Sequence, residues 1–162
     1  MNNERQILNV LEENAHATPA QIATLTGTEE TEIVFLIQKW NANGVIRRSK
    51  AVVDWEKWGE ESVAAYVDLK VMPEKGAGYD AIARNIYRYP EVRSLHLVSG
   101  SHDLRCVVVG RTMREVADFV AQKLATLERV TATSTHFVLQ RYKEDGEIYA
   151  ETPEDHRLMV TP

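Results

Sequence analysis

The segment from Thr18 to Ile46 constrains the fold of this 162-residue chain more tightly than any other. Pro19 directly follows Thr18, and Gln21 stands three positions after it, which is the pattern of a helix whose first turn is capped by threonine. Gly27 is expected to end this helix. A further helical segment follows at once. Two short helices joined at a glycine are typical of a helix-turn-helix, which places its second helix in the DNA major groove.

The second helix of this pair has an unusual charge for an element that contacts DNA. Thr28 is expected to cap it, and its apolar residues recur at three- and four-residue spacing until Asn43 and Gly44. Lys39 is its one basic residue, whereas its first part carries three acidic residues, Glu29, Glu30 and Glu32. We therefore expect this helix alone to bind DNA weakly.

Candidate DNA contacts lie on the second helix and directly after it. Threonine hydroxyls can bind phosphates or base edges, lysine binds phosphates, and a glutamate can accept a hydrogen bond from cytosine N4. The β-rich segment 45–53 is expected to form the strands of a wing, with three basic residues within four positions. The alternative for this basic group is an ordinary solvated cluster. The full candidate set is Thr28, Thr31, Glu32, Phe35, Lys39, Arg47, Arg48 and Lys50.

Composition limits the classes of protein to which the chain can belong. The net charge is −5, and most of the acidity lies after residue 142, so bulk charge does not favour binding to a phosphate backbone. DNA affinity then has to come from local basic residues or from several copies in an oligomer. A single cysteine, Cys106, excludes an internal disulfide and favours a cytoplasmic location. No apolar run is long enough for a membrane span, and no signal peptide is expected.

After Gly59 the hydrophobic pattern changes from helical to alternating. The order of predicted elements is β-α-β-β-α-β, which indicates a ferredoxin-like sandwich with two helices on one face of an antiparallel sheet. The expected fold class is therefore α+β. These elements are strands at 63–71, 92–99, 104–110 and 130–142, and helices at 79–89 and from Thr112 onward.

The resulting domain organisation has four parts. We expect a winged helix-turn-helix at 1–50, a linker strand at 51–60, the ferredoxin-like domain at 61–143 and an acidic tail at 144–162. The apolar run Leu158-Met159-Val160 is a candidate for docking on a neighbouring subunit. Two alternating sets of residues, Val63, Val67 and Leu69 on one side and Ala64 and Tyr66 on the other, place apolar or aromatic groups on both faces of the sheet. We therefore expect the face that the helices leave open to pack against another copy of the chain, with a solvated, imperfectly alternating face as the alternative.

Four stretches, in order, resemble the Lrp/AsnC family of feast/famine regulators, and the resemblance extends from about residue 4 to residue 143. Each stretch is weakly specific by itself, but four with the correct spacing are fairly specific. They are Gly44-Val45-Ile46 continuing through Ala51-Val52-Val53-Asp54 to Gly59, then Tyr89-Pro90-Glu91-Val92, then Val98-Ser99-Gly100-Ser101-His102-Asp103-Leu104, and last Val130 through Thr133, Thr135 and Val138-Leu139.

The resemblance implies a DNA-binding protein modulated by a ligand, with a C-terminal domain that dimerises and assembles into tetramers, octamers or larger rings. An amino acid usually binds between dimers in this family, near a hairpin loop. That loop corresponds to residues 100–103, where glycine can adopt positive φ or allow close approach of a backbone, and a carboxylate can pair with an α-ammonium group. An ordinary hairpin turn is the alternative. The implied effector-binding residues are Gly100, Ser101, His102 and Asp103, with Thr133 and Thr135 as further candidates.

Other classes of function receive little support from the sequence. There is no nucleophile elbow, phosphate loop or recognisable carboxylate pair, so we expect neither an enzyme nor a bound cofactor. His96, His102 and His136 lack the spacing of metal ligands, and we expect satisfied polar side chains there. The leading hypothesis is an oligomeric, DNA-binding transcriptional regulator that responds to an amino acid or a related small metabolite. The alternative is a metabolite-binding oligomer whose DNA binding is weak or lost.

Overall fold

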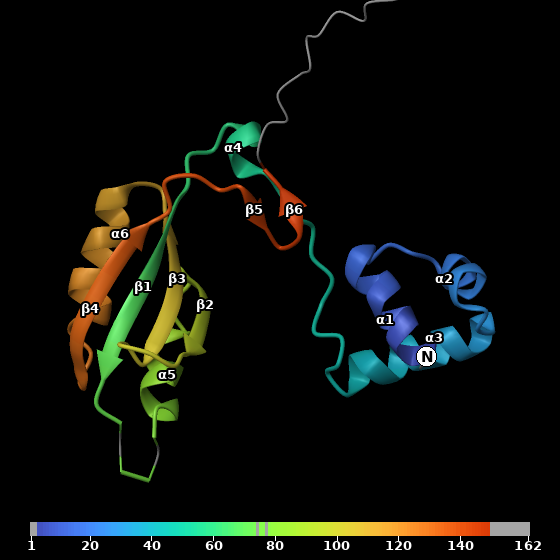
Figure 1. Ribbon diagram of the computed structural model, residues 1–162, viewed down its shortest axis with the longest axis horizontal. Helices are drawn as coiled ribbons and strands as arrows, with labels where there is room; N and C mark the ends of the chain where they lie inside the picture. The colour runs from blue at the N-terminus through green and yellow to red at the C-terminus, as the bar shows by residue number, and fades with distance from the viewer. Residues whose placement is uncertain (1–2, 74, 77, 150–162) are drawn as a thin grey trace, which may run out of the picture. The chain divides into compact units, whose positions relative to one another are not determined.

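The computed structural model describes residues 3–73, 75–76 and 78–149 and shows two compact units of an α+β protein (Figure 1). The boundary between the units falls between Val52 and Val53. Within the described residues, no helix is both long enough and apolar enough to cross a lipid bilayer. The tail segment Leu158-Met159-Val160, considered above for docking, lies outside the described residues.

The first unit is a three-helix helix-turn-helix, with α1 at Asn3–Glu13, α2 at Pro19–Thr26 and α3 at Glu30–Ala42. The start of α2 is confirmed, because the Thr18 side chain accepts from the Gln21 N–H, and the Gln21 side chain accepts in turn from the Thr18 N–H. Gly27 ends α2 at φ 68°, a left-handed conformation that favours glycine. The buried core of this unit consists of Ile7, Ile22, Ile33, Leu36 and Trp40.

The expected cap of α3 is wrong. The helix begins at Glu30, and the capping position is Glu29, whose side chain makes no capping hydrogen bond. Thr28 is buried instead, at 8% exposure, and its backbone N–H donates to the Thr26 Oγ1 at 3.4 Å. The Thr28 hydroxyl is itself buried and has no hydrogen-bond partner among the described residues, so it does not cap α3.

The expected wing and linker strands are also wrong, since residues 45–54 are all described and contain no strand. Gly44 turns the chain at φ 75°, after which the Ile46 N–H donates to the Trp40 carbonyl at 3.1 Å. The Ile46 side chain then packs against the core of the helical unit. β-branched residues form strands where a neighbouring strand pairs with them, and this segment pairs with none in the described structure. A short helix, α4 at Trp55–Trp58, follows it.

The second unit is a four-stranded antiparallel sheet in the order β2-β3-β1-β4, which confirms the ferredoxin-like prediction. The strands are β1 at Val63–Val71, β2 at Val92–Leu97, β3 at Leu104–Gly110 and β4 at Val130–Phe137. The helices are α5 at Asp80–Ile86 and α6 at Met113–Phe119, and α6 continues into a π-helical turn, η1, at Val120–Leu124. The Thr112 hydroxyl caps α6 as predicted, accepting from the Glu115 N–H.

One face of the sheet carries the core, because alternate residues of β1 and β3 pack against α5, α6 and η1. Ala65, Val67 and Leu69 are fully buried there, and Tyr89 packs edge-on against Phe119 with ring centres 5.3 Å apart. β4 ends at Phe137, earlier than the predicted 142. A short hairpin, β5 at Lys143–Glu144 and β6 at Glu147–Ile148, follows it.

Candidate functional site

The outward face of α3 is nearly neutral. Thr31, Phe35 and Gln38 are exposed at i, i+4 and i+7, so they share one side of the helix, opposite its buried core residues. Phe35 is 63% exposed although it is aromatic. Sequence reasoning missed Gln38, which the helical period alone places on this stripe. Glutamine can form two hydrogen bonds to an adenine edge in the major groove.

The remaining DNA candidates lie around this stripe. Glu32 and Lys39 are exposed on one flank of α3. The acidic side chains Glu30 and Glu32 belong to its first turn, where the helix dipole stabilises negative charge. The irregular segment that follows α3 contains three exposed basic residues, Arg47, Arg48 and Lys50. Thr28 differs from all of these, because it is buried and its Oγ1 has no hydrogen-bond partner. It therefore presents little surface to a partner.

The loop between β2 and β3 adopts a conformation that requires glycine. Gly100 has φ 139°, and a Cβ built at this position would meet no atom within 4 Å, so conformation rather than close approach explains the glycine. The Ser101 Oγ and the His102 Nδ1 lie 3.1 Å apart. The Lys70 Nζ, which sequence reasoning missed, donates to the Ser101 carbonyl at 3.3 Å. The loop and the end of β1 thus bring together the Ser101 hydroxyl, the His102 imidazole and the Lys70 ammonium group.

Asp103 anchors this loop to two other elements. Its Oδ2 accepts from the Val71 N–H at 2.8 Å, and its Oδ1 accepts from the Tyr79 hydroxyl at 3.2 Å. Its own N–H donates to the Leu69 carbonyl at 3.0 Å. Desolvation, together with the Asp103 carboxylate, raises the pKa of Tyr79 above its ordinary value, which keeps the phenol protonated as a donor. Both carboxylate oxygens therefore already serve protein donors.

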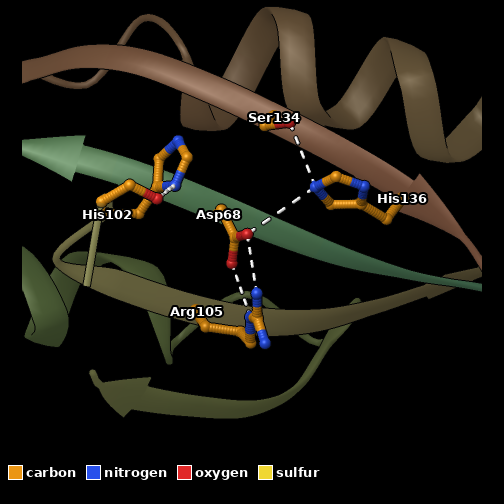
Figure 2. Close-up of polar contacts among 6 residues, drawn as sticks. Asp68, His102, Arg105, Ser134 and His136 are labelled. Carbon is orange, nitrogen blue, oxygen red and sulfur yellow. Dashed lines mark hydrogen bonds and ion pairs between the residues drawn. The ribbon is translucent and has the colours of Figure 1, made fainter. Parts of the chain in front are cut away.

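A polar cluster occupies the open face of the sheet, next to this loop (Figure 2). The Asp68 side chain is only 6% exposed, and Arg105 binds both of its oxygens, at 2.6 and 2.8 Å. The hydrogen bonds from Arg105 hold the pKa of Asp68 below its usual range against the opposing effect of burial. The His136 Nε2 lies 3.7 Å from the Asp68 Oδ2 and 3.1 Å from the Ser134 Oγ.

Thr133 and Thr135 lie on the other face of the sheet. They pair with Leu69 and Val67, whose side chains are buried under the helices, so the two threonines share the helix-covered face at edge strand β4. Strand β1 separates them from the β2–β3 loop within one copy of the chain. The structure thus brings residues 100–103 together with Lys70, and it leaves the two threonines apart from them.

The described residues contain no group of three or more His, Cys, Asp or Glu side chains placed to hold a metal ion. Cys106 is fully buried in β3, and burial raises the pKa of its thiol to about 12. This thiol therefore stays protonated at neutral pH and is a poor nucleophile.

Comparison with known proteins agrees with this architecture. A family model described as the Lrp/AsnC ligand binding domain matches residues 64–148. The HTH-type transcriptional regulator YugG of Bacillus subtilis is 42% identical over 160 residues, which cover 98% of this chain and 96% of YugG. The HTH-type transcriptional regulator FL11 of Pyrococcus horikoshii is 28% identical over 145 residues, which cover 90% of this chain and 93% of FL11.

Solved structures share the fold over most of the chain. An AsnC family transcriptional regulator from Agrobacterium tumefaciens has a TM-score of 0.73 at 25% identity, covering 98% of this chain and 99% of that one. The regulator NMB0573 of Neisseria meningitidis, solved in complex with L-methionine, has a TM-score of 0.73 at 21% identity, covering 89% and 92% of the two chains. Given the matched ligand-binding domain and the full-length likeness to YugG, this chain belongs to the Lrp/AsnC family of transcriptional regulators.

Proposed function

We propose that this protein is a DNA-binding transcriptional regulator whose DNA affinity changes when it binds an amino acid or a related small metabolite. The observation that carries this proposal is the exposed, nearly neutral stripe of α3 in a chain whose second unit matches a ligand-binding domain. The activity is regulatory rather than enzymatic, and its place of action is the cytoplasm.

DNA binding combines a reading face with phosphate contacts. The stripe formed by Thr31, Phe35 and Gln38 enters the major groove, where hydrogen-bonding and apolar groups read base edges. Arg47, Arg48 and Lys50, together with Lys39, bind phosphates and position the helix. A single copy offers few positive charges, so strong binding requires several copies on one DNA molecule.

The effector site is centred on the β2–β3 loop. Ser101, His102 and Lys70 offer hydrogen-bonding and cationic groups suited to the carboxylate of an amino acid. Gly100 permits the loop conformation, and Asp103 holds the loop in place rather than serving only the ligand. A related fold was solved with L-methionine, which supports an amino acid as the ligand class. Thr133 and Thr135 of a neighbouring copy complete this site when dimers assemble.

Oligomerisation uses the open face of the sheet. Tyr66 is 46% exposed there, and Asp68, Arg105 and His136 supply paired polar groups beside it. Tyrosine and arginine are both enriched in protein interfaces. We expect a homodimer through this face that assembles further into a tetramer or an octamer.

A DNA-binding titration tests the first part of this proposal. We expect the Arg47→Ala, Arg48→Ala double variant to lose affinity for the chain's own upstream DNA at least tenfold, and its salt dependence to decrease. The matched control removes two exposed arginines of the second unit, Arg111→Ala with Arg114→Ala, and should bind as the unmodified protein does. Equal losses in both double variants would show that only net charge matters.

A thermal-shift screen of the twenty amino acids tests the effector site. A ligand that binds only the folded protein raises the unfolding midpoint, and this shift should disappear in the Ser101→Ala, His102→Ala variant. A ligand-dependent shift in a protein that binds no DNA even at low salt would favour the alternative function, a metabolite-binding oligomer. The acidic group at the start of α3, Glu29, Glu30 and Glu32, is the feature that favours that alternative.

A further inference from the structure

A cavity of about 300 Å³ lies between α5 and the edge strand β2. Its size falls at the lower end of the range typical of small-molecule sites, roughly 300–1,000 Å³. Leu95, Leu97 and Leu104 contribute apolar lining, and Tyr79, Asp80 and Arg93 add polar and charged groups. The combination of an apolar surface with a few charged groups is typical of a ligand site.

The cavity lies on the helix-covered face of the sheet, away from the polar cluster on the open face. Leu95 and Leu97 pair with Cys106 and Leu104, and both of these partners are buried under the helices. The helix α5 has only seven residues and does not cover the end of β2, so Leu97 remains 61% exposed although it lies on the apolar face. Lys70, which contacts the candidate loop, lies on the opposite face, because it alternates along β1 with the buried residues Leu69 and Val71.

Arg93 reaches the cavity through an irregularity of the strand. The pairing of β2 with β3 shifts between Val92 and Ser94, which face Val108 and Val107, so Arg93 is the additional residue of a β-bulge. Bulges redirect side chains and are frequent beside binding sites. In the part of the chain that the structure describes, neither the Arg93 nor the Asp80 side chain has a hydrogen-bond or ion-pair partner. The cavity therefore presents one uncommitted cation and one uncommitted anion.

We propose that this cavity is a second ligand site, which binds a zwitterionic amino acid with an apolar side chain. The Arg93 guanidinium binds the carboxylate, the Asp80 carboxylate binds the ammonium group, and the apolar side chain packs against Leu95, Leu97 and Leu104. The site does not depend on the loop site proposed above. Tyr79 lines the cavity and also donates to Asp103, so a ligand held here contacts the side chain that is hydrogen-bonded to the anchor of the loop.

Calorimetric titration of the full chain tests the ligand class, with L-leucine as the probe. Two analogues each lack one charged group: leucinol has no carboxylate, and 4-methylpentanoate has no ammonium group. We expect each analogue to bind at least tenfold more weakly than leucine, because each loses one charge-assisted hydrogen-bonding pair. No leucine binding at millimolar concentration, or equal binding of all three compounds, would overturn the proposal.

Variants locate the binding site. Arg93→Gln and the cavity-filling change Ala83→Leu should each weaken leucine binding about tenfold or more, whereas Arg84→Gln, also on α5 but outside the cavity lining, should not. The loop variant Ser101→Ala, His102→Ala should retain binding in the cavity. Loss of binding in the loop variant alone would assign leucine to the loop and contradict the cavity site, while leaving the proposed function in place.

Sedimentation of the same variants separates a ligand site from a protein contact. The expected result is an unchanged oligomeric state for Arg93→Gln and Ala83→Leu, together with weaker leucine binding. A smaller oligomer in both variants, with leucine affinity unchanged, would show that the cavity receives a second copy of the chain, and the proposal would be wrong.

Discussion

Asp68 shows how a single residue combines burial with charge. Its carboxylate is nearly inaccessible, yet it remains ionised because Arg105 forms two hydrogen bonds to it across neighbouring strands. Its position in an alternating strand predicts the face on which it lies. Its burial is not predictable in this way, because it depends on Arg105 and His136, which lie on the two adjacent strands. Asp103 is similar, since the sequence placed it in a loop, and only the fold brings Val71 and Tyr79 to its two oxygens.

The substitution Asp68→Asn should lower the free energy of unfolding by about 1–2 kcal/mol, since it removes a charge-assisted pair whose arginine is half-exposed. The pKa of Asp68 is lowered in the folded state, so this stabilisation is present above the unfolded pKa of about 4 and is lost as pH falls through the folded value. Urea unfolding from pH 7 to pH 3 measures both effects. Asp118→Asn, in an exposed pair with Arg114, is the control and should change stability little.

Tyr79→Phe removes the hydroxyl that donates to Asp103, and should cost about 1 kcal/mol of stability. Amide hydrogen exchange in residues 98–103 should become faster, because the loop loses one of its anchors. Tyr142→Phe, at an exposed tyrosine, provides the comparison. Unchanged loop exchange in Tyr79→Phe would show that Val71 and Leu69 hold Asp103 without the phenol.

At the scale of elements, local chemistry made α2 and α6 predictable, because Thr18 and Thr112 cap them through bonds within one turn. The ferredoxin-like order of elements was also predictable, because apolar and polar residues alternate along each strand. The wing and linker strands were not predictable, since a strand depends on a partner that no local pattern supplies. The candidate loop was located by resemblance to a family, and Gln38 could have been found from the helical period of α3. Lys70 could not, because only the fold brings its ammonium group to the Ser101 carbonyl.

For α3, Glu30→Gln with Glu32→Gln should raise DNA affinity several-fold, because two negative charges are removed beside the phosphate backbone. The same change should slightly destabilise the helix, by about 0.3–1 kcal/mol, because these carboxylates interact favourably with the positive end of the helix dipole. Anisotropy titration and thermal unfolding measure the two effects. The control Glu12→Gln with Glu13→Gln makes the same change in charge on α1, and an equal gain there would remove any special role of α3.

At the scale of the whole molecule, we expect strong DNA binding only from an oligomer, because the DNA-reading helix of one copy carries little positive charge. Tyr66→Lys places a charge on the open face of the sheet. We expect it to raise the dissociation constant of the oligomer at least tenfold and so to favour the monomer. Analytical ultracentrifugation measures this change, and circular dichroism checks that the fold is retained. Met113→Lys, at a half-exposed position on α6, should leave the assembly intact. An unchanged oligomer in Tyr66→Lys would place the interface elsewhere.

The central claim is that ligand binding in one unit changes DNA binding by the other. The most direct measurement is the dissociation constant for upstream DNA, determined by anisotropy with and without each of the twenty amino acids. At least one amino acid should change this constant by a factor of about 5–150, the usual range of allosteric coupling, and Ser101→Ala with His102→Ala should abolish the change while preserving DNA affinity without ligand. An identical constant with every amino acid at saturating concentration would contradict the account.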